Sequence, residues 1–440
     1  MPEPLQGLRV VELGTAIQGP AAALFLSDMG AEVIKIEPPN GEANRAHRGV
    51  NNPFPPDAHS TQFVAANRGK KSLWLDAKGE RGRAALLRLL ETADVFVSNF
   101  RQSALDKMGY GYEVLRERNA RLIYAVVNGF GPQGALHDKA MVDGAAQARG
   151  GLLSLTGQPD GPPTLPGAAI ADTAGAMQFA LGIMTALVAR ERYGVGQKVN
   201  TSGYGTQIWL QMWELTHSSI TGKALSRAGN HHPNVPGMYG MHGTADGQHL
   251  FLAFPMTTES WLALCEFLGE PELAANERWH RTAERIGMSD PDEHYDHLRA
   301  RLTAAFLRKS LEDCEAFLDS QPEIIWNRVC THDDVLSDPQ ARANGYFVDM
   351  EISGVGPTQV VGNLVHLSET PGSAKGPTAE VSQHTEEILL DLGYSWDEIT
   401  ATNEETQAAV RKALTEGDTA RGRSSVGPNG PGAPGPLIRR

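Results

Sequence analysis

The sequence predicts an α/β protein whose main domain is built on a mostly parallel β-sheet. Short apolar strands alternate with amphipathic helices through residue 127, and a strand–helix–strand unit of ordinary length opens the chain. The character of the sequence changes after about Ser202, which predicts a second, smaller domain. At 440 residues, with 41% hydrophobic and 21% charged content, the chain is long enough for two or three packed units.

The elements of the main domain follow from runs of apolar residues bounded by turn residues. The expected strands cover 8–13, 31–37, 72–76, 93–97 and 122–127. The expected helices cover 20–29, 81–92, 112–118 and a long apolar segment from Asp172 to Arg190, which ends before Gly194. Because strands that alternate with helices usually pair in parallel, these segments predict a sheet with helices on both faces.

The same patterns divide the chain into five parts. We expect a large domain over 1–205, a linker over 206–230, a small domain over 231–365, a C-terminal segment over 366–417 and a disordered tail over 418–440. The small domain is expected to contain strands over 247–254 and 346–352, with helices between 258 and 320. In the C-terminal segment, a capped amphipathic helix over 382–393 is expected to return to the large domain.

Composition excludes several classes of function. The net charge of −13 argues against nucleic acid as the main partner, because phosphate binding needs a concentrated basic face. The N-terminus has no basic and apolar signal pattern, and no run approaches about 18 uninterrupted apolar residues, so we expect a cytoplasmic protein without a membrane partner. The three cysteines show no metal spacing and are expected to be core residues, and the histidines indicate no metal site.

Two glycine-rich or basic segments raise the possibility of a nucleotide site. The turn from Gly14 to Gly19 follows a strand, but it lacks the middle glycine of a dinucleotide motif and the Lys-Ser/Thr of a P-loop. The segment Asn67-Arg-Gly-Lys-Lys-Ser has three cations before a strand. These cations fit either a solvated charge run or a site for a phosphorylated ligand, and both interpretations stay open.

Asp172 is a lone carboxylate among small residues at the start of the long apolar helix. It could cap the helix N-terminus, which is the common role of aspartate at such a position. It could instead act as a nucleophile, because small neighbours leave its oxygens accessible and the positive end of the helix dipole favours the ionised form.

Taken in order, these segments resemble the class III coenzyme A (CoA) transferases, the family of formyl-CoA and carnitine CoA-transferases, which has α-methylacyl-CoA racemase as a relative. The resemblance covers about residues 5 to 395. The segments that carry it include Gly-Ala-Glu-Val-Ile-Lys-Ile-Glu-Pro-Pro, Asn-Arg-Gly-Lys-Lys-Ser, Val-Ser-Asn-Phe, Leu-Asp-Lys-Met-Gly-Tyr, Ala-Asp-Thr-Ala-Gly and Gly-Asn-His-His-Pro-Asn. It implies a Rossmann-like large domain, a smaller α+β domain and an interlocked homodimer.

The resemblance also implies a reaction and a set of site residues. Asp172 is the family's nucleophile, with Gln18 and Asp143 as further catalytic residues. CoA would move from an acyl-CoA donor to a small carboxylic acid through an aspartyl anhydride and an aspartyl-CoA thioester, with no metal and no permanently bound cofactor. The implied CoA-binding residues are Ile17, Leu75, Asn99, Phe100, Ala104, Lys107, Met108 and Met141.

Two alternative functions remain from the sequence. A racemase or isomerase would move the α-proton of an acyl-CoA with a histidine directly before the acid, where this chain has Val142, and His137 lies six residues before Asp143. A non-catalytic acyl-CoA binding protein would bind CoA without depending on Asp172. For a transferase, we expect four residues after the linker to shape the acyl pocket: Trp209, Trp213, His231 and His232.

Overall fold

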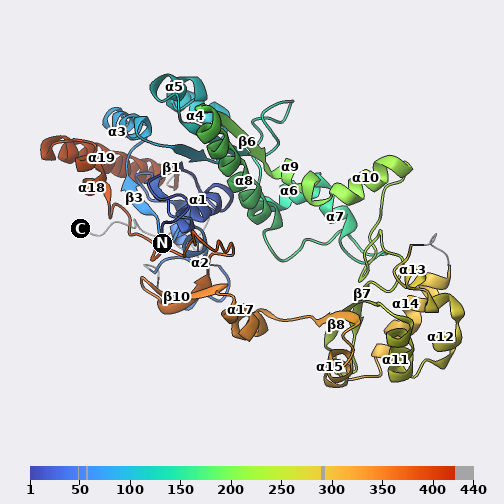
Figure 1. Ribbon diagram of the computed structural model, residues 1–440. Helices are drawn as coiled ribbons and strands as arrows, with labels where there is room; N and C mark the ends of the chain where they lie inside the picture. The colour runs from blue at the N-terminus through green and yellow to red at the C-terminus, as the bar shows by residue number, and fades with distance from the viewer. Residues whose placement is uncertain (48, 56–57, 289–292, 422–440) are drawn as a thin grey trace. The chain divides into compact units, whose positions relative to one another are not determined.

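The computed structural model describes residues 1–47, 49–55, 58–288 and 293–421, and it divides the chain into two compact units (Figure 1). Unit 1 contains Met1–Gln147, Ala168–Gln207 and the described chain from Pro339 onward. Unit 2 contains Ala148–Gly167 and Ile208–Asp338. Residues 148–167 and 339–365 thus fall in the other unit from the domain that their sequence position suggested.

Unit 1 is built on a six-stranded sheet in which every pairing is parallel. Its strands are β1 (Arg9–Leu13), β2 (Glu32–Glu37), β3 (Lys71–Trp74), β4 (Val95–Ser98), β5 (Ile123–Asn128) and β6 (Lys198–Ser202). They lie in the order β3-β2-β1-β4-β5-β6, which is the strand order of the Rossmann fold. The prediction of a mostly parallel sheet is confirmed, although β6 was not anticipated.

Apolar residues cover both faces of the sheet, because successive side chains of a strand point to opposite faces. In β1, Val10 packs into the core on one face and Val11 into the core on the other. Helices α1 (Gln18–Asp28) and α8 (Ile170–Tyr193) cover the Val10 face, while α3 (Glu80–Glu91), α5 (Tyr112–Arg118) and α18 (Thr385–Asp391) cover the Val11 face. The result is a three-layer α/β/α arrangement, the usual solution for a parallel sheet.

Helix α8 is long and apolar enough to cross a membrane by length and composition alone. The core helix of a soluble domain passes the same test, because both must be largely apolar. In the structure, Phe179 and Ile183 of α8 are fully buried against the sheet in the same core as α1. Its contacts with α1 and β6 therefore account for its apolar character on that side.

The chain after Pro339 contributes to unit 1 in three ways. A hairpin of β10 (Phe347–Ile352) and β11 (Gly356–Val361) follows α17 (Pro339–Ala343). Thr385 of α18 accepts a hydrogen bond from the Trp74 N–H at 2.9 Å, and Thr406 of α19 (Trp396–Arg421) accepts one from the Asp76 N–H at 3.1 Å.

The expected tail is wrong at its first residues, because α19 continues through 418–421. The rest of the expected tail, 422–440, lies outside the described residues.

Unit 2 has its own core around a three-stranded antiparallel sheet in the order β7-β8-β9. The strands are β7 (Gly240–Gly243), β8 (His249–Pro255) and β9 (Ile324–Arg328). Its helices include α10 (Met212–Thr221), α11 (Thr258–Leu268), α12 (Pro271–Ala275), α13 (Thr282–Arg285), α14 (Glu293–Phe306), α15 (Leu311–Asp319) and α16 (His332–Ser337). Cys265 and Cys314 are buried here as expected, but Cys330 is exposed just after β9, which corrects its expected place in the core.

The remaining helices are short. They are α2 (Thr61–Asn67), α4 (Gln102–Met108), α6 (Asp143–Gly150), α7 (Leu152–Leu155) and α9 (Gly203–Leu210). Helices α9 and α10 occupy much of the segment 206–230, so the expected linker contains regular structure.

Candidate active site

The candidate site lies where the strand order of the sheet changes direction. β1 and β4 are neighbours in the sheet but not in the chain, so the segments that leave their carboxyl ends diverge and open a crevice. The chain leaves β1 through the turn Gly14–Ile17 into α1, and it leaves β4 at Asn99. Ligands of open α/β sheets bind at such a switch point.

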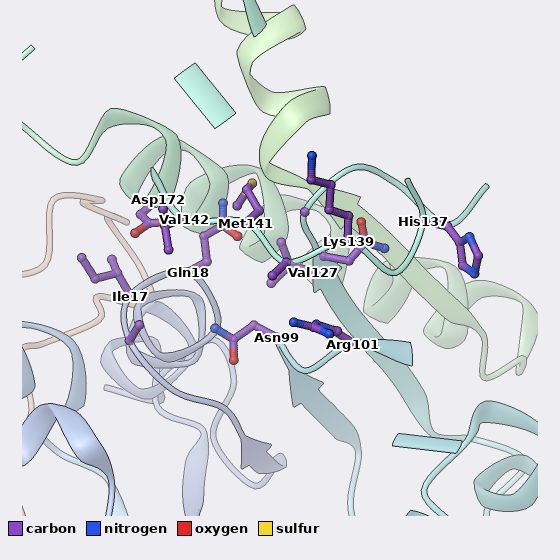
Figure 2. A pocket seen from close by; sticks show the side chains of 14 residues that line it. Ile17, Gln18, Asn99, Arg101, Val127, His137, Lys139, Met141, Val142 and Asp172 are labelled. Atoms are coloured by element: carbon purple, nitrogen blue, oxygen red, sulfur yellow. The ribbon is translucent and has the colours of Figure 1, made fainter. Parts of the chain in front are cut away.

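A pocket of about 220 Å³ occupies this crevice within unit 1 (Figure 2). Figure 2 shows Asp172 and Gln18 at one end of the view and His137 at the other. The pocket is lined by Ala16, Ile17, Gln18, Asn99, Arg101, Val127, Asn128, Gly129, His137, Lys139, Ala140, Met141, Val142 and Asp172. Two of the three expected catalytic residues and three of the expected CoA-binding residues therefore share one cavity.

The turn after β1 has an unusual backbone. Ala16 has a φ of 63°, in the left-handed region that costs a residue with a side chain about 1–2 kcal/mol. The Asn99 side chain bridges this turn to β4: its Oδ1 accepts from the Thr15 N–H at 3.0 Å, and its Nδ2 donates to the Thr15 carbonyl oxygen at 2.6 Å. Asn99 thereby fixes the turn across the crevice, in addition to lining the pocket.

Asp172 is the third residue of α8 and is half-buried. It is not the N-cap, because that position belongs to Ala169, so the capping interpretation is wrong. Within the described residues, the Asp172 carboxylate accepts no hydrogen bond, and Asp172 lines the pocket beside Gln18 (Figure 2). Burial, and secondarily the nearby Asp143 carboxylate, raises the pKa of Asp172 to about 6.

Asp143 performs the capping that Asp172 does not. Its Oδ1 accepts from the N–H groups of Ala171 at 2.8 Å and Asp172 at 3.2 Å, which satisfies two donors that a helix N-terminus leaves unpaired. The Gln147 Nε2 donates to Asp143 Oδ2 at 2.6 Å and fixes the carboxylate from the other side. Asp143 does not line the pocket itself, but it determines the position of the backbone that carries Asp172.

Gln18 connects α1 to the start of α8. Its Nε2 donates to the carbonyl oxygen of Ala171 at 3.1 Å, directly before Asp172 in the chain. Gly175 makes this approach possible, because a Cβ there would collide with the Gln18 amide. Gly203 plays a similar part for Met141, whose thioether occupies the place of a Cβ at residue 203.

The other expected CoA-binding residues are not in this pocket. Leu75 is fully buried in the sheet core, and Phe100 and Met108 pack partly buried against the same core. On α4, Ala104 is half-buried and Lys107 is exposed. The structure therefore does not gather these five residues around Asp172, and their role in binding CoA stays a prediction.

The sequence analysis missed two basic pocket residues, Arg101 and Lys139, and named a third, His137, only in the racemase alternative. Arg101 follows the end of β4, and the other two lie in the loop between β5 and α6. A search of all segments that follow the carboxyl ends of the strands next to the switch point would have found them.

The cations around Asn67 are part of the structure and not an open phosphate site. Arg68 pairs with Asp28 at 2.5 Å, Lys70 pairs with Glu12 at 2.6 Å, and Lys71 pairs with Glu32 at 2.9 Å. Of the two interpretations of this segment, binding of a phosphorylated ligand is therefore not supported.

The four residues expected to shape an acyl pocket all belong to unit 2. The His232 ring stacks on Trp213 with centroids 4.9 Å apart, and its Nε2 lies 3.2 Å from Glu214. His231 contacts the His242 ring edge-on at 6.3 Å, and Trp209 is exposed. Their part in an acyl pocket stays a prediction. Over the described ranges, no cluster of His, Cys, Asp or Glu could hold a metal ion.

The fold and the pocket define an α/β protein with a half-buried carboxylate at the switch point of a Rossmann-type sheet. Residues 5–385 match the model of CoA-transferase family III, and the chain belongs to this family. It is therefore a class III CoA-transferase by family, and CoA thioesters and carboxylic acids are its class of substrates.

Individual relatives cover nearly the whole chain. It is 34% identical to the succinyl-CoA:mesaconate CoA-transferase of Haloarcula hispanica over 406 residues, which span 88% of this chain and 96% of that protein. It is 33% identical to the succinate–glutarate CoA-transferase of Agrobacterium fabrum over 399 residues, with the same coverage. A crystal structure of a CAIB/BAIF family protein from Brucella suis, 31% identical, superposes with a TM-score of 0.77 over 89% of this chain and 100% of that chain.

Proposed function

We propose that the protein transfers CoA from an acyl-CoA to a carboxylic acid with Asp172 as the covalent carrier. In the first step, an Asp172 oxygen attacks the thioester carbonyl, the C–S bond breaks, and CoA leaves as a thiolate. The product is a mixed anhydride between the donor acyl group and the aspartate. The thiolate then attacks the aspartyl carbonyl, the anhydride C–O bond breaks, and the donor leaves as a carboxylate.

The acceptor acid then repeats these steps in the opposite order. Its carboxylate attacks the aspartyl thioester and releases the thiolate, and the thiolate attacks the acceptor acyl carbonyl to give the new acyl-CoA and free Asp172. A carboxylate suits this role because its anhydride and its thioester both remain activated toward the next nucleophile. The observation that carries the proposal is an Asp172 carboxylate uncommitted to any described hydrogen bond, at a pocket in the switch-point crevice.

Two neighbours support this role of Asp172. Asp143 accepts hydrogen bonds from the N–H groups of Ala171 and Asp172. It thereby holds the start of α8, the backbone that carries the Asp172 carboxylate. The Gln18 amide, which lines the pocket beside Asp172, is a neutral donor for the oxygen on which negative charge develops during each attack. Gln18 and Asp143 are thus proposed as functional residues alongside the nucleophile.

CoA itself is proposed to enter along the basic side of the pocket. Arg101 and Lys139 line this cavity and are exposed, so their cations are available to the phosphates of CoA. Ile17 and Met141 add apolar contacts for the uncharged part of CoA. No metal and no permanently bound cofactor enters the proposed reaction.

The exchanged acids are proposed to be short dicarboxylic acids. The two relatives described above act, by name, on succinyl-CoA with mesaconate and on succinate with glutarate. All of these are acids of four or five carbons with two carboxylates. Acids that differ by a single methylene differ by only about 1–3 kcal/mol in binding, so a panel of substrates is needed to rank them.

We propose that the active form is a homodimer. Within unit 1, α8 exposes Met177 at 70% and Leu181 at 67%, and within unit 2, α10 exposes Met212 at 59% and Trp213 at 52%. Exposed apolar side chains gathered on single helices are typical of surfaces that a partner covers.

The decisive experiment incubates the protein with acyl-CoAs of mono- and dicarboxylic acids, traps adducts with hydroxylamine or borohydride, and maps the modified peptide by mass spectrometry. Modification of Asp172 is the expected result, with the largest yield from succinyl-CoA or glutaryl-CoA. Asp172→Asn is the matched control, since it keeps the shape of the side chain and removes the nucleophile.

The alternatives give different results in the same experiment. Solvent deuterium at the α-carbon of an unmodified acyl-CoA, without an adduct on Asp172, would indicate racemase chemistry with His137 as a candidate base. Tight CoA binding that is equal in wild type and Asp172→Asn, without turnover, would indicate a binding protein.

A further inference from the structure

The turn that leads to Gln18 is fixed by a carboxylate that does not line the pocket. Glu42 Oε1 accepts a hydrogen bond from the N–H of Ala16 at 3.0 Å and one from Thr15 Oγ1 at 3.4 Å. Glu42 follows β2 and lies outside the elements that carry the proposed catalytic residues. The N–H that it holds belongs to the residue with the left-handed backbone, so Glu42 acts at the point where the turn is strained.

Glu42 is itself held by a buried set of charges below the turn. The other carboxylate oxygen of Glu42 pairs with Lys35, and Lys35 also pairs with Glu12 at 2.6 Å and donates to the Gly14 carbonyl oxygen at 3.2 Å. Lys70 pairs with the second Glu12 oxygen at 2.6 Å. We call these four residues, Glu12, Lys35, Glu42 and Lys70, the buried charge cluster.

The buried charge cluster is electrically balanced and almost completely removed from the protein surface. It contains two carboxylates and two ammonium groups, and none of the four residues is more than 4% exposed. Such a cluster adds little stability compared with well-packed apolar side chains, because the cost of removing the charges from water offsets their attraction. A gain in stability therefore explains poorly why the buried charge cluster lies next to this turn. Holding the backbone of the turn in one geometry explains it better.

We propose that Glu42 is a positioning residue for the reaction of Asp172. Held by Lys35, its carboxylate keeps Ala16 in the left-handed region and so determines the direction in which the chain enters α1. The first residue of α1 is Gln18, whose amide reaches the start of α8 beside Asp172. The inference rests on the proposed function, and it assigns to Glu42 a role in orienting Gln18 and not in contacting substrate.

The choice of residue 16 makes the inference testable. Glycine adopts a positive φ as readily as a negative one, whereas alanine needs help from its surroundings. If Glu42 supplies this help, glycine at residue 16 should make Glu42 partly dispensable. A purely structural role for Glu42 predicts no such rescue, because glycine at residue 16 does not restore a missing charge in the buried charge cluster.

The experiment compares Glu42→Gln, Glu42→Ala and each of them combined with Ala16→Gly, with Ala16→Gly alone as the reference. The readouts are kcat and KM for acyl-CoA and the rate at which Asp172 is modified. We expect Glu42→Ala to lower kcat and the modification rate about tenfold or more with KM changed less than about threefold, since small displacements of positioned groups affect mainly the reacting step. Glu42→Gln, which keeps an oxygen for the Ala16 N–H, should lose less.

Ala16→Gly should restore at least about fivefold of the rate lost in Glu42→Ala. The control is Asp28→Asn, which breaks the buried pair with Arg68 at the far end of α1 and touches neither the turn nor the pocket. It should lower the melting temperature without a selective loss of kcat. An equal loss of kcat in Asp28→Asn, or a lack of rescue by glycine, overturns the inference.

Crystal structures separate this inference from the proposed function. Residue 16 should leave the left-handed region in Glu42→Ala and keep it in wild type and in Glu42→Gln. An unchanged backbone at residue 16 in Glu42→Ala overturns the inference whatever the activities are. A wild-type protein that forms no adduct with any acyl-CoA would instead contradict the proposed function, and the backbone comparison would still decide the role of Glu42.

Discussion

Asp143 and Asp172 meet at the N-terminus of α8, where the Asp143 carboxylate accepts a hydrogen bond from the Asp172 N–H. They have different roles because their surroundings differ. Asp143 accepts two backbone N–H groups and a glutamine amide, so its charge is used to hold the start of α8. Asp172 has no such partners within the described residues, and burial together with the charge of Asp143 disfavours its ionised form. A poorly solvated carboxylate without partners is a better nucleophile than one that several donors stabilise.

Replacing the nucleophile should stabilise the protein at neutral pH. The pKa of Asp172 is raised in the folded state, so its contribution to stability is complete below its ordinary pKa near 3.8 and is lost as pH rises through about 6. At pH 8, the free energy of unfolding of Asp172→Asn should therefore exceed that of wild type by about 1 kcal/mol after allowing for solvent screening, and the difference should be clearly smaller at pH 4.5. Calorimetry at both pH values, with exposed Asp160→Asn as the control, checks this. A destabilised Asp172→Asn at pH 8 would contradict it.

Activity should fall on the acidic side as Asp172 becomes protonated. We expect the acidic limb of log kcat/KM against pH to have its midpoint near 6, the pKa of Asp172. Asp143→Asn keeps an oxygen for the two N–H groups but removes the negative charge, so the limb should move to lower pH. A limb that stays in place in Asp143→Asn would show that the Asp143 charge does not act on Asp172.

At the scale of elements, the site depends on how closely α1 approaches the start of α8. Both helices pack on the same face of the sheet, and their first turns meet where Gln18 reaches Ala171. Small residues keep this approach open. The small residues of the segment Ala-Asp-Thr-Ala-Gly therefore allow α1 to approach α8 closely, in addition to leaving the nucleophile accessible.

Gly175→Ala tests this packing. Alanine is favoured over glycine in a helix by about 1 kcal/mol, so α8 alone would gain stability. The new Cβ would displace the Gln18 amide, and we expect kcat to fall by at least about tenfold, because complete loss of one oxyanion-stabilising donor typically costs about 100-fold or more. Gln18→Ala should cost about as much, and the double variant should be no slower than the slower single variant, since both remove the same contact. Full additivity of the two losses would contradict the shared cause.

At the scale of the whole molecule, the exposed apolar faces of α8 and α10 predict a homodimer. Light scattering on the purified protein should give about twice the mass of one chain, 47.4 kDa. Met177→Glu with Leu181→Glu should weaken the dimer and lower activity, because a charge in an apolar interface must be removed from water. Val114→Glu on α5 is the control for a charge placed at another exposed apolar position. A fully active monomer would contradict the prediction.

The strands and most helices of the main sheet could be predicted because each is a local pattern. The helix over 112–118 was predicted at the same residues, and β1, β2 and β5 begin within one residue of their expected starts. The strand β6 and the long helix α19 were missed. Their sequences are polar, and they are stabilised by partners far away in the chain, β5 for the strand and α3 and α18 for the helix.

The sequence by itself determined the α/β class, the family resemblance and the candidate nucleophile, because these depend on local periodicity and short motifs. Only the tertiary structure decided that Asp143 and not Asp172 caps α8, that Asn99 and Glu42 hold a left-handed turn, and that Arg101 and Lys139 line the same pocket. These relations join residues that lie far apart in the chain. They arise from the order of the parallel strands, which brings the ends of β1 and β4 together and which no local pattern contains.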